Sequence, residues 1–174
     1  MCSSMVGELP SSARSSAMSL TSGAMPAPAR AAGTSRIMTA LSRGARFCQF
    51  VDDAAEARGL IRRNADALGV IGKCKIWRRD ATRLGRAAPQ PPFDLVFADP
   101  PYGNGLGDRA LASLVADGWL GPGAVVVVEE SSAAEITPPA ELFLIDRRVY
   151  GGTQALFYHF RPNNLSISAS LSSI

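Results

Sequence analysis

The chain has 174 residues, 47% of them hydrophobic and 19% charged, which is enough for one domain with a sizeable core. Its 16 glycines and 12 prolines are an ordinary share and exclude collagen-like and wholly disordered proteins. No apolar run approaches the roughly 20 residues that cross a bilayer, so we expect a soluble protein with no membrane partner. Three cysteines without a CxxC pair predict neither a disulfide framework nor a zinc site, and they favour a reducing cytoplasm.

The net charge of +3 is unevenly distributed along the chain. Residues 1–46 carry five arginines against a single acid, Glu8, whereas the rest of the chain is close to neutral. The overall charge therefore says little about the partners of the folded part. A local group of arginines can contact a phosphate backbone, although a solvated polar face is its commoner meaning; the group consists of Arg78, Arg79, Arg83 and Arg86.

Residues 1–39 are a mixture of Ser, Ala, Pro, Gly and Met with no sustained helical or strand period. We predict that this segment is poorly ordered and contributes nothing to the domain, unless part of Ala17–Met25 supplies a substitute strand. Serines interrupt every apolar stretch that could act as a secretory signal, while an Arg- and Ser-rich transit peptide stays open. The domain is expected over residues 40–160, followed by a flexible tail at 161–174.

Strand and helix patterns alternate from residue 47 onwards. The runs Leu95–Ala98 and Val125–Val128 are apolar on both faces, as inner strands covered by helices on both sides require. Two further strand patterns flank Tyr150–Thr153 and predict an antiparallel hairpin. We therefore predict an α/β fold, a Rossmann-like, doubly wound, mostly parallel sheet with a C-terminal hairpin. The expected elements are strands at 47–51, 73–77, 93–98 and 124–129, helices at 54–68 and 107–117, and hairpin strands at 142–149 and 154–160.

The sharpest motif is Asp99-Pro100-Pro101-Tyr102, directly after a predicted buried strand. Ligands of open α/β sheets bind at the carboxyl ends of strands, so this segment is expected at the binding edge. Two consecutive prolines fix the backbone and remove two amide donors, so that a carboxylate, a carbonyl and an aromatic ring are held rigidly. The two oxygens can accept hydrogen bonds from an exocyclic amine, and Tyr102 can stack on a flipped base. A turn with a chance aromatic residue is the alternative.

The motif matches the [DN]-P-P-[YF] signature of S-adenosylmethionine-dependent methyltransferases that act on exocyclic amines of bases. Flanking segments narrow the match, so that about residues 40 to 160 resemble the bacterial family that methylates the guanine N2 amine of small-subunit (16S) ribosomal RNA. The resemblance implies a class I methyltransferase fold, S-adenosylmethionine as cofactor, and ribosomal RNA in the small subunit as partner of a cytoplasmic monomer. The segments that carry it are Leu41–Ala45, Phe50–Asp53, Leu60–Asn64 and Gly151–Tyr158.

Site residues are implied by the same resemblance. Asp99, Pro100, Pro101 and Tyr102 form the catalytic loop, and Asp99 also faces the cofactor. Asp52, at the end of its strand, is implied to accept the ribose hydroxyls of the cofactor, and an acid there also suits a ribose diol on chemical grounds. Asp80 and Ala81 are implied to contact the adenine ring, although an N-cap role for Asp80 is nearly as good. A helix N-terminal role suits Asp53 and Glu56 better than it suits Asp52.

Other catalytic chemistries find little support. The only histidine, His159, lies in a predicted strand among aromatic residues and is interpreted as a packing residue. One histidine and three scattered cysteines assemble no nucleophilic triad or metal centre, which disfavours hydrolase and zinc chemistry. Methyl transfer needs neither, since it depends on aligning an amine with an already activated methyl group.

The first strand and Gly-rich turn that hold the cofactor's methionine part in the family are not recognisable before residue 40. Ala32-Gly33-Thr34-Ser35 is only a partial echo of that turn. Codons for Ala-Gly-Thr-Gly-Ala read one base later give Pro-Ala-Pro-Ala-Arg, which is the sequence of Pro26–Arg30, so a shifted reading frame is one hypothesis and a divergent extension another. Two alternative functions stay open, a DNA adenine amine methyltransferase and a non-catalytic remnant without its cofactor loop.

Overall fold

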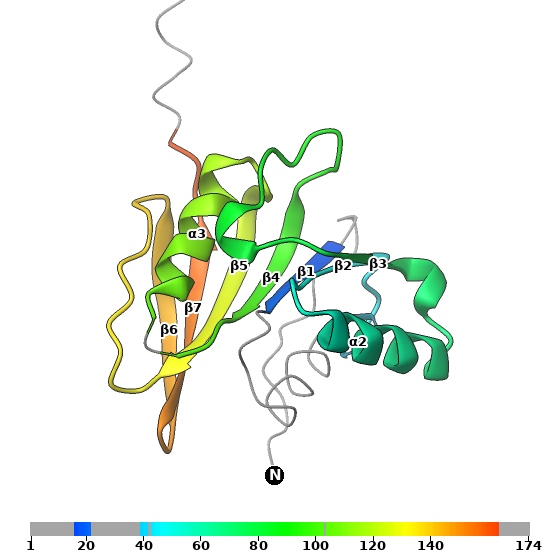
Figure 1. The fold of residues 1–174 in the computed structure, drawn as a ribbon. Coiled ribbons are helices and arrows are strands. Elements are labelled where there is room, and N and C mark those ends of the chain that lie inside the picture. Colours follow the sequence, from blue (N-terminus) through cyan, green and yellow to red (C-terminus); the bar gives the residue numbers. More distant parts are fainter. Residues whose placement is uncertain (1–15, 22–38, 42, 103, 164–174) are drawn as a thin grey trace, which may run out of the picture.

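The computed structural model describes residues 16–21, 39–41, 43–102 and 104–163. These residues form a seven-stranded sheet in the order β3-β2-β1-β4-β5-β7-β6 (Figure 1), in which β7 runs antiparallel to both of its neighbours. The Rossmann-like fold with a C-terminal hairpin is therefore confirmed. The strands are β1 Ser16–Thr21, β2 Phe47–Val51, β3 Cys74–Trp77, β4 Phe93–Asp99, β5 Leu120–Ser131, β6 Leu142–Tyr150 and β7 Thr153–Phe160, and the helices are α2 Ala55–Ala67 and α3 Leu106–Ala116, with short 3-10 turns η1 Ile71–Lys73 and η2 Ala81–Arg83.

The first strand comes from the segment that the sequence predicts to be poorly ordered. β1 pairs in parallel with β2 on one side and β4 on the other, so it fills the centre of the sheet. The expectation that residues 1–39 contribute nothing to the domain is therefore wrong for Ser16–Thr21. The stated alternative, a substitute strand from part of Ala17–Met25, overlaps with the observed strand β1. Residues 1–15 and 22–38, including the partial Gly-rich echo, lie outside the described residues.

Alternation of small and large side chains explains how so polar a segment forms a central strand. Ala17 and Ser19 face one side of the sheet and Met18 and Leu20 the other, and all four are buried. Ser19 interrupts the kind of apolar run by which β4 and β5 are recognised. Its small side chain is nevertheless buried, at 3% exposure. The two faces of β1 therefore differ in the size of their side chains and not in their polarity. A search for continuous apolar residues misses such a strand.

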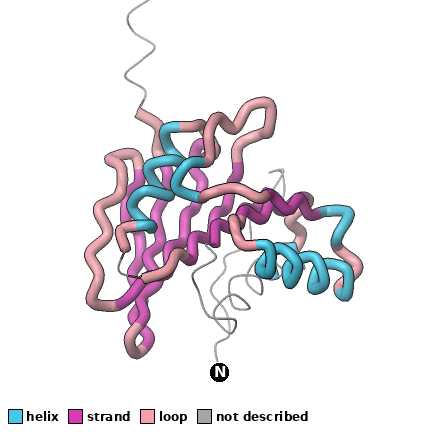
Figure 2. The backbone as a smooth tube through the Cα atoms, viewed as in Figure 1, coloured by secondary structure: helices cyan, strands magenta, loops and turns pink. Residues whose placement is uncertain are grey.

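The two helices cover opposite faces of the sheet (Figure 2). On one face, Met18 and Val96 pack with Leu111 of α3 in the larger core cluster. On the other, Phe50 packs with Ile61 of α2 in a smaller cluster. Trp119, directly before β5, stacks on Phe93 with the ring centroids 6.2 Å apart. Covering both faces is what makes the inner strands apolar on both sides.

Element boundaries agree closely with the sequence prediction. The predicted helix at 54–68 is α2, and Gly69 follows it with φ +66°, its amide donating to the Asp66 carbonyl at 2.9 Å, as expected of a glycine that ends a helix. The largest difference is β5, which begins four residues before the predicted Ala124 because Leu120 already pairs with Phe93, followed by an irregularity in register. The hairpin turns at Gly151, which has φ +58°.

Candidate active site

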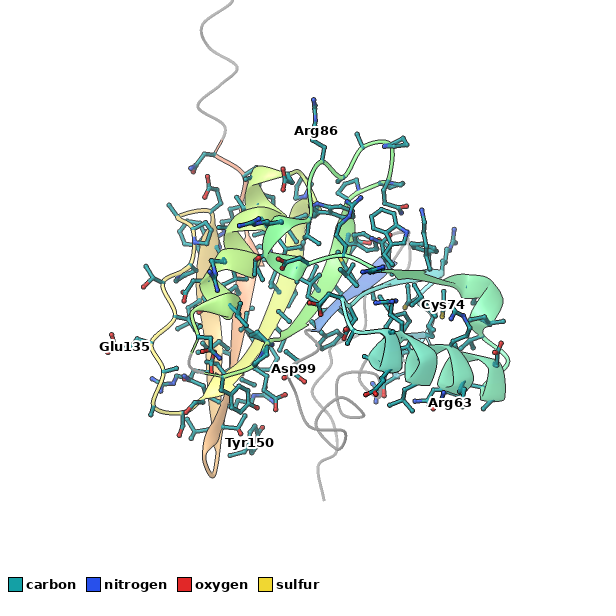
Figure 3. All side chains as sticks on the ribbon, in the orientation of Figure 1. Arg63, Cys74, Arg86, Asp99, Glu135 and Tyr150 are labelled. Atoms are coloured by element: carbon teal, nitrogen blue, oxygen red, sulfur yellow. The ribbon has the colours of Figure 1, made fainter. Side chains whose placement is uncertain are left out.

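The carboxyl ends of the parallel strands meet at one edge of the sheet. Thr21, the last residue of β1, is in register with Asp99, the last residue of β4. The neighbouring pair Ala98 and Val128 is the last in register between β4 and β5, so Glu129 follows on β5 beside Asp99. This edge is where the sequence predicts the binding site to lie. Among the labelled residues in Figure 3, Asp99 lies toward this end and Arg86 toward the other.

The Asp99–Tyr102 segment is seated against the start of α3. A Cβ atom on Gly107 would lie 3.1 Å from Cδ1 of Ile136 and 3.7 Å from Cγ of Pro100, so the first turn of α3 packs closely against both side chains. Asp99 is 5% exposed. Asn104 supports the following turn by donating from Nδ2 to the Tyr102 carbonyl at 3.2 Å. The loop therefore has a fixed seat, as its two prolines predict.

Tyr102 projects from this loop toward β5. Its ring is 37% exposed, which leaves a face open to a planar ligand. Its hydroxyl donates to Oε1 of Glu129 at 3.2 Å. Burial raises the pKa of Tyr102, a hydrogen bond with Thr153 lowers it, and the neighbouring carboxylates of Glu129 and Asp99 raise it further. The phenol is thus held protonated and oriented by groups on β5 and β7.

A small, partly open pocket lies on the other side of the same edge. It brings together Asp80, Ala81 and Pro100, which the sequence assigns to one site although about 20 residues separate them. The pocket walls are mainly apolar, which suits a flat ring better than a phosphate. The complete lining is Leu20, Asp80, Ala81, Thr82, Ala98, Pro100, Leu106 and Ala110.

Asp80 serves two roles in this arrangement. It is the N-cap of η2, and its Oδ1 accepts from both the amide and the hydroxyl of Thr82 at 2.8 Å. Partial burial disfavours its ionised form, but the Thr82 hydrogen bonds and the charges of Arg83 and Arg109 outweigh burial and lower its pKa. The Asp80 carboxylate is ionised and is held in place by Thr82, so it offers a fixed acceptor to an amine at the rim of the pocket. Asp80 is therefore the N-cap of η2, as one of the two interpretations predicts, and it also lines the pocket.

Asp52 lies where the sequence predicts it, directly after β2, but it does not line the pocket. It is fully buried, and its Oδ1 accepts from the Ala54 amide at 2.7 Å. Its backbone carbonyl accepts from Arg58 at 3.0 Å. Asp52 therefore shapes the turn into α2, a role that the sequence gives to Asp53 and Glu56 instead.

The sequence analysis misses two parts of the site. Leu20, Ala98 and Ala110 line the pocket from three elements, and no local motif links residues so far apart. Glu129 is missed because it lies within an apolar strand and belongs to no motif of its own, although it stands beside Asp99 near the carboxyl edge of the sheet. Within the described part of the chain, no three His, Cys, Asp or Glu side chains gather to hold a metal, and no helix is long and apolar enough to span a membrane.

The arginine group does not form one surface. Arg79 stacks over Trp77 at 4.7 Å and donates to the Leu84 carbonyl, so it serves the packing of this crossover. Arg83 lies near Asp80, whereas Arg86 lies toward the opposite end of the sheet from Asp99 (Figure 3). His159 on β7 is half-buried and accepts a weak contact from Arg161 at 3.4 Å, away from the carboxylates of the edge.

Sequence comparison connects this geometry to known proteins. A family model described as "Conserved hypothetical protein 95" matches residues 31–159. The chain belongs to this family. Among curated members, the ribosomal RNA small subunit methyltransferase D of Haemophilus influenzae is 27% identical over 118 residues, covering 64% of this chain and 59% of the relative. The protein of the same name from Buchnera aphidicola is 22% identical over 119 residues, covering 68% and 62%. The chain thus matches about three fifths of the length of these relatives.

Solved structures show the same fold. A putative methylase from Haemophilus influenzae superimposes with a TM-score of 0.72 at 22% identity, covering 86% of this chain and 88% of that one. A putative methyltransferase from Escherichia coli gives a TM-score of 0.69 at 22% identity, with 86% and 78% covered. The family match begins at residue 31, nine residues before the domain expected from the sequence.

Proposed function

We propose that this chain is an S-adenosylmethionine-dependent methyltransferase that acts on the exocyclic N2 amine of a guanine in small-subunit ribosomal RNA. The observation that carries the proposal is the rigid Asp99-Pro100-Pro101-Tyr102 loop, seated at the carboxyl edge of the sheet beside a small, mainly apolar pocket. The names of the curated family members support ribosomal RNA as the substrate class.

The chemistry of the pocket lining suits the adenine part of the cofactor. Leu20 and Ala98 offer apolar walls to a flat ring, and the Asp80 carboxylate accepts hydrogen bonds from an exocyclic amine at the rim. The Ala81 amide, next to Asp80, faces the same pocket edge in this proposal. The Asp52 carboxylate, directly after β2, accepts the ribose hydroxyls.

When bound, S-adenosylmethionine would supply an activated methyl group to the amine, and the proton that the methylated amine sheds would pass to the Asp99 carboxylate. The residues of the chain align the amine for this step. The Asp99 carboxylate and the Pro100 carbonyl accept the two amine hydrogens, which turns the nitrogen lone pair out of conjugation with the ring. Tyr102 stacks on the base, and burial of Asp99 excludes water from the reacting nitrogen.

Labelled cofactor distinguishes the candidate functions. The full chain is incubated with immature small ribosomal subunits or with naked DNA, and the modified nucleosides are identified by mass spectrometry. Label in N2-methylguanosine of the subunits is expected. Label only in DNA adenine would replace the proposal with the DNA alternative. Calorimetric titration with S-adenosylhomocysteine then separates an enzyme from a remnant, since an intact pocket binds it and a remnant does not.

A further inference from the structure

Asp99, the last residue of β4, and Glu129 of the neighbouring strand β5 lie side by side on the same face of the sheet. Ala98 and Val128 are in register, and each carboxylate residue follows directly, so both side chains point away from the face that Ala98 covers. Tyr102 bridges the two strands, because it leaves the Asp99 loop and its hydroxyl donates to Glu129 at 3.2 Å. A second carboxylate therefore stands beside the loop that receives the amine.

A carboxylate at this position distinguishes bases by the atom next to their amine. In guanine the N2 amine is adjacent to N1–H, so the two groups form a continuous row of donors. In adenine the N6 amine is adjacent to an N1 lone pair, which is an acceptor. An acidic side chain, which only accepts, matches the first arrangement and repels the second. An unmatched buried polar group is a stronger source of selectivity than a difference in size.

We propose that Glu129 is a specificity-determining residue, which accepts the N1–H of the target guanine while Asp99 and Pro100 accept from its N2 amine. The inference rests on the function proposed above. A carboxylate offers about four acceptor positions, so Glu129 can accept from a base as well as from Tyr102. It is half-buried, so its contact with a base is partly shielded from water, which strengthens a hydrogen bond to a charged group.

The competing explanation is that Glu129 only orients the Tyr102 ring. Two variants separate the two roles. Glu129→Gln keeps the shape of the side chain and an oxygen that accepts from Tyr102, but it loses the charge and gains a donor that suits an adenine-like N1. Tyr102→Phe removes the hydroxyl contact and leaves the carboxylate in place. A role in orientation predicts similar effects of the two variants on all substrates, whereas a role in recognition does not.

The substrate pair that isolates the N1 contact is guanine and 2-aminopurine, which carries the same exocyclic amine beside an N1 acceptor. The methylated guanine is first mapped in immature small subunits, and subunits are then reconstituted with RNA that carries 2-aminopurine at that position. The ratio of kcat/KM for the two substrates is measured for the full-length wild-type chain and for each variant. Thermal unfolding of each variant controls for folding.

We expect the wild-type chain to prefer guanine, Glu129→Gln to lower this preference by about 10- to 100-fold, and Tyr102→Phe to leave the preference within about threefold whatever its effect on rate. An unchanged preference in Glu129→Gln would overturn the inference and leave the proposed function standing. A wild-type chain that methylates no guanine would refute the proposed function, and the inference would fall with it.

Discussion

The place of β1 in the centre of the sheet predicts a large effect for one side chain in a segment of low complexity. Met18 is fully buried, in register with Val96 of β4 and Gln49 of β2, and it belongs to the larger core cluster. Replacing a buried methionine with alanine removes transfer free energy and leaves a cavity, at a cost of about 2–5 kcal/mol. The Met18→Ala variant should therefore lose a large fraction of the stability of a domain of this size.

The assay is thermal unfolding followed by circular dichroism. A loss of this size lowers Tm by about 5–20 °C in a chain of about 150–250 residues. Leu144→Ala is the matched control, because Leu144 is 53% exposed on the edge strand β6 and its truncation should change Tm by only a few degrees. If Met18→Ala changed Tm no more than Leu144→Ala, β1 would not be part of the folded core. The prediction that residues 1–39 are poorly ordered would then hold for Ser16–Thr21 as well.

The remaining predictions for single residues concern the catalytic loop. Asp99→Ala should abolish methyl transfer to RNA and leave Tm close to that of the wild type, because the lost carboxylate leaves the amine in conjugation with its ring; retention of a tenth or more of kcat would exclude this role. Tyr102→Phe should retain more activity than Tyr102→Ala, since stacking, worth about 1–3 kcal/mol per base, depends on the ring and the hydroxyl only contacts Glu129. Equal losses in kcat/KM for these two variants would instead indicate that the hydroxyl takes part in the chemistry.

Much of the fold follows from local patterns in the sequence. β4 and β5 are recognisable because their apolar runs satisfy two covered faces at once, and α2 because its helical period ends at Gly69. β1 is not recognisable because its burial comes from the strands on either side of it. Ser19 is buried only because β2 and β4 flank it, and that is a property of the assembled sheet.

The site, like the fold, has parts that the sequence predicts and parts that only the folded structure reveals. The Asp99–Tyr102 loop is a contiguous motif whose rigidity follows from its own prolines, so sequence alone predicts both its position and its shape. The pocket beside it is formed by Leu20, Asp80 and Ala110 from three separate elements, and only the fold brings them together. Asp52 shows a further limit, since its place after β2 is predictable while its bond to Ala54 is not.

Filling the central position of the sheet also changes the expectation for the whole chain. Without β1, Phe50 and Val96 would lack a neighbour and the strands on each side would carry unpaired backbone groups, so the chain would be molten and would bind no cofactor. With β1 in place, Phe50 is in register with Ser19 and Val96 with Met18, and that reason for instability is removed.

The full chain should therefore unfold in one cooperative thermal transition, and its Tm should rise with added S-adenosylhomocysteine. A ligand that binds only the folded state stabilises it by about 2.7 kcal/mol at a free concentration 100 times its Kd, which corresponds to several degrees in Tm. Asp99 and Tyr102 do not line the proposed adenine pocket, whereas Asp80 does, so Asp80→Ala should reduce this rise and Tyr102→Phe should not. A cooperative transition that no concentration of S-adenosylhomocysteine moves would mean that the sheet is complete but the cofactor site is not, which is the result expected of a folded remnant and not of an enzyme.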